Sequence, residues 1–77
     1  MKYKVKVVYR SGDTFHFKFD DYEIANITYE RYCLKFADNA SSLEGEYIIA
    51  LLNEDNSIMK QLKLISSKWF TYYLFQQ

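Results

Sequence analysis

The sequence predicts a small all-β domain, mainly antiparallel, in which five or six strands form a barrel or a curved sheet that starts with a β-hairpin. Two observations support this prediction. Segments near the N-terminus alternate apolar and polar side chains with the period of a half-buried strand. The chain also contains no proline that would exclude a central strand. Its 77 residues are enough for one small β-rich domain, 1–77.

The N-terminal hairpin is the most regular predicted element. Its first strand has an apolar face made of Tyr3, Val5, Val7 and Tyr9. Its second strand has an apolar face made of Phe15, Phe17 and Phe19. A three-residue loop at 11–13 pairs Tyr9 with Phe15, so the two apolar faces match along the whole hairpin. The same register sets Lys6 directly opposite Lys18, where like charges repel.

The middle of the chain predicts a third strand. Residues 20–26 form a link with room for one helical turn. Residues 27–37 favour a strand, because Tyr32, Leu34 and Phe36 alternate onto one face and Ile27 and Tyr29 share the opposite parity. The apolar residues change parity between Tyr29 and Tyr32, as they do at a β-bulge. Residues 38–42 are typical of a loop.

A second hairpin is predicted from two apolar segments, 46–53 and 58–65, around a turn at 54–57. The alternative fold is α+β, with a helix at 42–54. Ser41-Ser42-Leu43-Glu44 fits a helix-capping box, and the apolar residues of this segment can share one helical face. Gly45 near the helix start and the run Tyr47-Ile48-Ile49 favour the strand.

The C-terminal segment 69–75 predicts a strand with aromatic or aliphatic side chains on both faces. One face can complete the core. The other needs a further sheet, another chain or solvent, and an intramolecular barrel position remains the alternative to an interface. Protein interfaces are enriched in Tyr and Trp. We therefore expect interface aromatics at Trp69, Phe70, Tyr72 and Tyr73.

Size and cysteine content also favour self-association. Domains this small often need a disulfide, a metal or oligomerisation to be stable. The single cysteine, Cys33, excludes an internal disulfide, and one His with one Cys is too few for a structural zinc site of the usual kind. A homodimer is the remaining expectation.

Nothing in the sequence predicts secretion or a membrane span. The first residues alternate lysine with apolar side chains, so they lack the apolar core of a signal peptide. No segment approaches the roughly 20 apolar residues that a spanning helix needs. A lone cysteine without a secretory signal is typical of a reducing compartment, so we expect a cytoplasmic protein with no membrane partner.

Charges are segregated along a chain whose formal net charge is zero. Residues 1–18 hold five basic side chains and one carboxylate, whereas residues 19–57 hold nine carboxylates and two basic side chains. The candidate acidic partner-binding surface consists of Glu44, Glu46, Glu54 and Asp55. The candidate anion-binding residues are Lys4, Lys6, Arg10 and Lys18.

No residue pattern indicates catalysis, a metal site or a cofactor. The two glycines are isolated, and nothing places Cys33 beside His16 as a nucleophile and base. The main hypothesis is a non-enzymatic protein-interaction module, of the kind that phages and mobile elements use to inhibit a host or defence protein. The alternative is a small β-barrel that binds single-stranded nucleic acid through aromatic side chains and lysines. Its weakness is that zero net charge gives no long-range attraction to phosphates.

Overall fold

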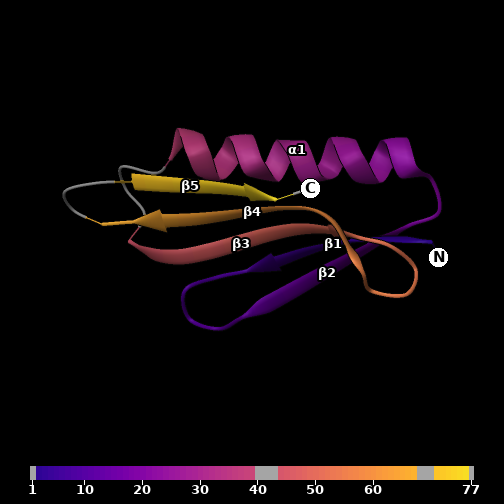
Figure 1. Cartoon of the computed structure of the whole chain (residues 1–77), viewed down its shortest axis with the longest axis horizontal. Coiled ribbons are helices and arrows are strands. Elements are labelled where there is room, and N and C mark those ends of the chain that lie inside the picture. The colour runs from indigo at the N-terminus through magenta and orange to yellow at the C-terminus, as the bar shows by residue number, and fades with distance from the viewer. Residues whose placement is uncertain (1, 40–43, 68–70, 77) are drawn as a thin grey trace.

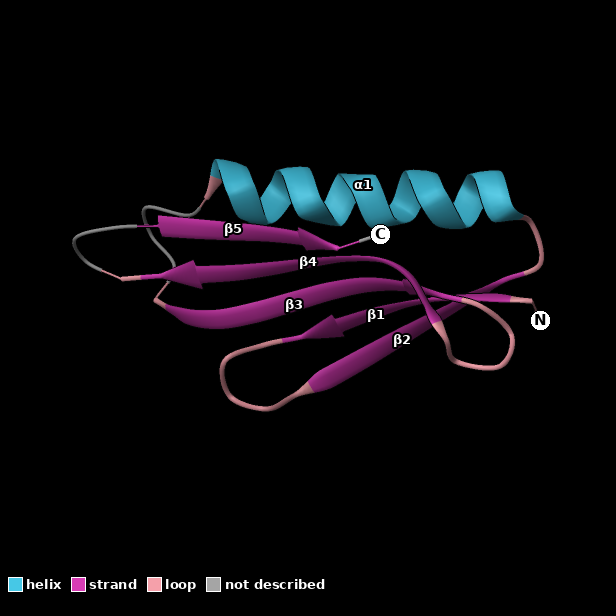
Figure 2. Ribbon diagram, viewed as in Figure 1, coloured by secondary structure: helices cyan, strands magenta, loops and turns pink. Residues whose placement is uncertain are grey.

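The computed structural model describes residues 2–39, 44–67 and 71–76. The elements along the chain are β1 (Tyr3–Val8), β2 (Thr14–Phe19), α1 (Tyr22–Asp38), β3 (Gly45–Leu52), β4 (Ile58–Ser66) and β5 (Thr71–Gln76). The strands form one antiparallel sheet in the order β2-β1-β3-β4-β5 (Figure 1). The helix lies along one side of that sheet (Figure 2). The N-terminal strand is therefore inside the sheet, and β5 is an edge strand.

The predicted mainly antiparallel β domain, beginning with a hairpin, is confirmed. The sheet is open, however, and does not close into a barrel. A helix gives the fold the α+β character of the alternative prediction, but it spans residues 22–38 and not 42–54. The segment 45–52 is β3, so the helix proposed there is wrong where the structure describes it; residues 42 and 43 lie outside the described part.

The first hairpin has the predicted loop length and facing, but its register is shifted. Val7 pairs with Phe15, where the sequence predicted Tyr9. The Tyr9 N–H donates to the Asp13 carbonyl and the Gly12 N–H donates to the Tyr9 carbonyl, both at 2.9 Å. These bonds define a three-residue loop at 10–12, one residue earlier than predicted. Gly12 occupies its third position at φ +91°, a conformation that favours glycine.

The second hairpin repeats the same turn. The Asn53 N–H donates to the Ser57 carbonyl and the Asn56 N–H donates to the Asn53 carbonyl, both at 2.9 Å. Asn56 takes the third loop position at φ +68°, which asparagine tolerates better than most residues. The predicted turn between the two apolar segments is confirmed. The pairing of β3 with β4 shifts between Leu51 and Leu52, where a bulge interrupts the ladder.

The predicted third strand at 27–37 is wrong, because these residues belong to α1. The helix begins after Asp21, whose side chain accepts a hydrogen bond from the Glu23 N–H at 3.2 Å, as an N-cap does. At its other end, the Asn39 side-chain amide donates to the Lys35 carbonyl at 2.7 Å. The buried residues Ala25, Tyr29 and Phe36 recur at helical spacing and face the sheet.

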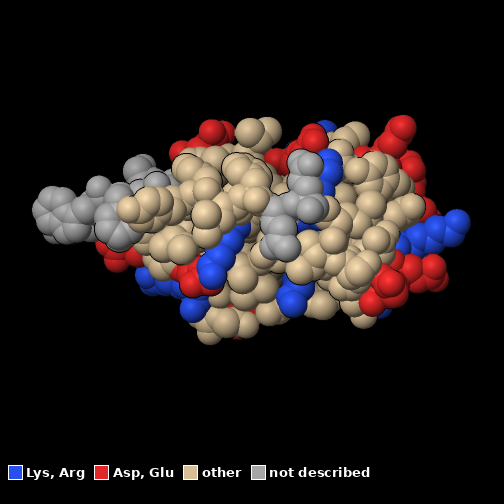
Figure 3. All heavy atoms as spheres, in the orientation of Figure 1, with Lys and Arg blue, Asp and Glu red and all other residues tan. Residues whose placement is uncertain are grey.

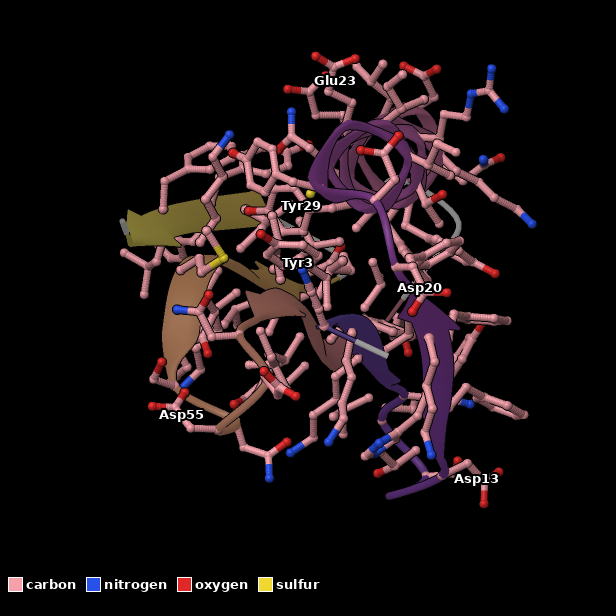
Figure 4. All side chains as sticks on the ribbon, turned by 90° about the vertical axis from the view of Figure 1, so that its right-hand side faces the viewer. Tyr3, Asp13, Asp20, Glu23, Tyr29 and Asp55 are labelled. Carbon is pink, nitrogen blue, oxygen red and sulfur yellow. The ribbon has the colours of Figure 1, made fainter. Side chains whose placement is uncertain are left out.

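The core lies between α1 and one face of the sheet. Its fully buried strand residues are Val5, Val7, Ile49, Leu51, Leu62 and Leu64. The helix packs mainly on β3 and β1 and less extensively on β2 and β4. Seen along the strands in Figure 4, Tyr3 and Tyr29 lie between helix and sheet, whereas Glu23 points away from both. No helix in the described ranges is long and apolar enough to cross a membrane. No second layer of the described chain covers the helix side of β5 or the opposite face of the sheet, although Ala50 and Leu52 on that face are buried among their neighbours.

Candidate interaction surfaces

The edge strand β5 exposes large apolar side chains in succession. The exposed fractions are 59 % for Tyr72, 42 % for Tyr73, 55 % for Leu74 and 71 % for Phe75. Because side chains alternate across a strand, Tyr73 and Phe75 lie on the helix side and Tyr72 and Leu74 on the opposite face. No described strand pairs with the outer edge of β5. Both faces and the outer edge of this strand are therefore accessible to a partner.

A groove of about 410 Å³ runs between α1 and the end of the sheet that the helix does not cover. Its helix wall includes Tyr29, Cys33 and Leu34, and its strand wall includes Leu62, Tyr73 and Phe75. The groove exists because α1 packs mainly on β3 and β1 and has little contact with β5, which leaves β5 without a second layer above it. Its size falls within the range of pockets that accept small ligands or a few side chains.

The polar groups of this groove already have partners. The Lys60 ammonium donates to the side-chain oxygen of Asn26 at 2.8 Å. Burial raises the pKa of Cys33, and a hydrogen bond from Tyr29 partly opposes this rise. Burial, and to a smaller extent the nearby Cys33, also raises the pKa of Tyr29. No buried side-chain nitrogen or oxygen within the described residues lacks a partner. The groove therefore offers apolar surface and a neutral thiol, a group that is a poor nucleophile.

Exposed apolar side chains continue from the groove onto the helix. Leu34 is 63 % exposed and Ile27, two turns earlier on the same side, is 47 % exposed. In Figure 3, uncharged side chains make up much of the view, with a few basic side chains among them, and most carboxylates lie nearer its rim. We call β5, the groove, Leu34 and Ile27 together the β5 surface. Apolar surfaces of this extent are typical of interaction sites.

The predicted interface aromatics are only partly placed. Tyr72 and Tyr73 lie on β5 and are exposed, but they point to opposite faces of the sheet. Trp69 and Phe70 lie outside the described residues. Phe75, Leu34 and the groove residues were missed by the sequence prediction. The parity that Phe75 shares with Tyr73 could have identified it, whereas the helix residues could not be found while 27–37 was assigned to a strand.

The four predicted acidic residues do not form one patch. Glu44 and Glu46 lie at the start of β3, whereas Glu54 and Asp55 lie in the turn after it. A strand of eight residues separates the two pairs by about 25 Å. Glu46 is also paired with Lys63, 3.0 Å away. In the turn, the Ser57 hydroxyl and N–H donate to Asp55 and lower the pKa of its carboxyl.

Three of the four predicted anion-binding residues do come together. Lys4 pairs with Lys18 across β1 and β2, and Lys6 pairs with His16 beside them, so all four side chains lie on the face opposite the helix. The expected Lys6–Lys18 pair is thus replaced by Lys4–Lys18. Arg10 is separate, because it lies in the hairpin loop and its guanidinium donates to the Glu44 carbonyl at 3.3 Å.

His16 and Cys33, the pair considered as base and nucleophile, do not lie together. His16 lies on the open face of β2, and Cys33 lies on α1, on the other side of the sheet. No group of three or more His, Cys, Asp or Glu side chains in the described ranges could hold a metal ion. Comparisons with protein-family models, with curated proteins and with solved structures found no match for this chain.

Proposed function

We propose that this protein is a non-enzymatic protein-interaction module that self-associates through the β5 surface. The observation that supports this function best is the succession of four exposed apolar side chains, Tyr72 to Phe75, on an edge strand. Hydrophobic area of this kind stabilises association when a partner removes it from water. Tyrosine also brings a hydroxyl that can bond at the wet rim of an interface.

The edge itself lacks the usual protection against pairing. Natural edge strands carry lysine, proline or bulges that prevent another strand from adding to them. The residues of β5, Thr71–Gln76, include no charged residue and no proline. At the opposite edge of the sheet, β2 carries His16 and Lys18. This contrast favours β5 as the edge that a second strand joins.

A second copy is the simplest partner, because two β5 strands can pair antiparallel around a twofold axis. Four aromatic or aliphatic side chains, each roughly half exposed, offer about 400 Å² of apolar surface per copy. Leu34, Ile27 and the strand backbone raise the total for two copies to about 1,000 Å² or more, near the lower limit for specific interfaces. Such a dimer should dissociate on dilution.

Light scattering after size exclusion, over about a hundredfold dilution, tests this proposal. We expect a dimer that dissociates at the lowest concentrations, and a monomer for Phe75→Lys at every concentration. The matched control is Phe15→Lys on the other edge strand, where Phe15 is 50 % exposed; it should dimerise like the unmodified protein. A monomeric unmodified protein, or a dimer that Phe75→Lys leaves intact, would refute self-association through β5.

Inhibition of a host or defence protein remains a proposal about a second partner. Because the acidic residues occupy two separate places, charge reversal at Glu54 and Asp55 should act independently of reversal at Glu44. If one of these two charge reversals abolishes capture of a partner and the other does not, the reversal that abolishes capture identifies the surface used. Nucleic-acid binding stays the alternative: Lys4, Lys6 and Lys18 share one face, but Phe15 and Phe17 lie on the other, so the hairpin places no Phe, Tyr or Trp ring beside the lysines for bases to stack on.

A further inference from the structure

The face of the sheet opposite α1 contains a second depression, of about 380 Å³. Its aliphatic lining, or floor, comes from the three strands β1, β3 and β4. Val8, Ile48 and Ile58 are at least partly exposed there, whereas Ala50 and Leu52 lie at the bottom and are only 2 % and 6 % exposed. Lys4, Lys6 and His16 line the side toward β2. This depression is separated from the β5 groove by the thickness of the sheet. It is therefore an independent site.

The cations beside this depression form a compact group. In an antiparallel ladder, directly opposite residues have Cα atoms about 5 Å apart, so Lys4 lies next to Lys18 and Lys6 next to His16. Lys4 contacts a neutral group, the side-chain oxygen of Asn56, at 2.6 Å. Within the described residues, neither Lys6 nor Lys18 forms an ion pair. Like charges held this close reduce stability slightly, unless a ligand of opposite charge is bound.

Several carboxylates approach this face at its margins. Glu46 is held by Lys63 near the start of β3, and Asp55 accepts hydrogen bonds from Ser57 within its own turn, next to the Asn56 that Lys4 contacts. Asp20 follows Lys18 by two residues at the end of β2, whereas Glu23 lies on the far side of α1 (Figure 4). Between these margins, Lys4, Lys6 and Lys18 stand together beside aliphatic side chains.

We propose that this open face binds an acidic amphipathic helix of a partner protein, with its aliphatic side chains on the floor and its carboxylates against Lys4, Lys6 and Lys18. A sheet whose two faces are both apolar is normally covered on both sides, and here α1 covers one. A helix laid on the second face would complete a three-layer arrangement by the same packing. Helix-in-groove recognition of this kind depends on aliphatic anchors at helical spacing.

The floor decides between this partner and nucleic acid. Bases bind to proteins by stacking on aromatic rings, and the residues that line the depression include no Phe, Tyr or Trp; its one ring is the His16 imidazole at its side. Tyr72, the exposed aromatic residue that β5 places on this face, pairs with Ile65 at the opposite corner of the sheet from Lys4. Aliphatic surface next to ammonium groups is instead complementary to a partner helix that carries Leu or Ile next to Asp or Glu.

The test uses two synthetic helical peptides with leucine at i, i+3, i+4 and i+7. One carries glutamate on its polar face, and its twin carries lysine at the same positions. We expect fluorescence anisotropy to show binding of the glutamate peptide to the full chain, weakening with salt, and no binding of the lysine twin. Lys6→Glu and Lys18→Glu should each weaken binding about tenfold, because each reverses a charge at the contact. Lys35→Glu, on the exposed side of α1, is the matched control and should leave affinity unchanged.

Three results would overturn the proposal: no binding of the glutamate peptide at low salt, equal binding to Lys6→Glu, or preferential binding of an oligothymidine that is lost in Lys6→Glu. The last result would assign the face to nucleic acid. Circular dichroism of each variant separates lost binding from lost folding. Because the site does not involve β5, Phe75→Lys should bind the peptide as well as the unmodified protein does, so self-association and helix binding can fail separately.

Discussion

Replacing Gly45 with alanine places a methyl group in space that Arg10 already occupies. Gly45 begins β3 at φ +111°, and a Cβ built there would lie 2.8 Å from the Arg10 Cβ and 3.1 Å from its Cδ. The Arg10 guanidinium also bonds to the Glu44 carbonyl, so the side chain is held over this glycine. The contact joins the loop of the first hairpin to the start of a central strand.

Two terms set the size of the effect. A positive φ destabilises a residue that has a Cβ by about 1–2 kcal/mol. Alanine recovers about 0.4–1 kcal/mol of this loss, because it restricts the unfolded chain more than glycine does. Gly12 supplies the matched control: it has φ +91° and nothing within 4 Å of the same Cβ. Overpacking against Arg10 adds about 1–3 kcal/mol at Gly45 alone. We expect Gly45→Ala to destabilise the fold by about 2–4 kcal/mol and Gly12→Ala by about 1 kcal/mol.

Urea unfolding of the single and double variants measures both terms. Arg10→Gly removes the opposing Cβ, so the double variant Arg10→Gly/Gly45→Ala should be more stable than additivity allows. Arg10→Ala retains that Cβ and should relieve less. Equal losses for Gly45→Ala and Gly12→Ala, or strict additivity in the double variant, would refute the steric reasoning and leave backbone strain as the sole cause.

Three further predictions follow from the ionisable groups. Burial raises the pKa of Cys33 above its ordinary 9.0, so iodoacetamide should alkylate the folded protein more slowly than the urea-unfolded chain; equal rates would contradict this. Burial also raises the pKa of Tyr29 above 10.0, so the folded state holds the hydroxyl proton more tightly than the unfolded chain does. This contribution to stability is present below pH 10 and is lost as the pH rises above it. The free energy of unfolding should therefore fall less steeply with pH in Tyr29→Phe than in the unmodified protein. Ser57→Ala should move the NMR titration of Asp55 upward, because its two hydrogen bonds from Ser57 are reduced to one.

The first hairpin could be predicted from sequence because apolar and polar side chains alternate along both of its strands. The period of two fixes which side chains face the core, and a shift by one residue would expose them all. A shift by two residues keeps the facing, however, so pattern alone could not separate the predicted pair Tyr9–Phe15 from the observed pair Val7–Phe15. The conformation of Gly12 decided the register, since it places the glycine at the third loop position.

The helix was missed because its composition favours a strand. Ile27, Tyr29 and Tyr32 have high β propensity, and Tyr32, Leu34 and Phe36 alternate as strand residues do. The buried set Ala25, Tyr29 and Phe36 has helical spacing instead, and Leu34 proves to be exposed. Packing against the sheet overrides local preference here. The β5 groove could not be predicted, because one of its walls is that helix.

The position of β1 between β2 and β3 bears on how the chain reaches this fold. Both hairpins close through three-residue loops, and such local pairings form within about 1–10 μs. The β1–β3 pairing joins segments separated by almost half of the chain, including α1. The chain must therefore lose the entropy of closing this long loop before the pairing contacts stabilise it. Folding should therefore be limited by the meeting of two preformed halves, the β1–β2 hairpin with its helix and the β3–β4–β5 meander. During synthesis, β1 lacks one of its two neighbouring strands until β3 has been made. Val5 and Val7 therefore remain without their β3 partners during that interval.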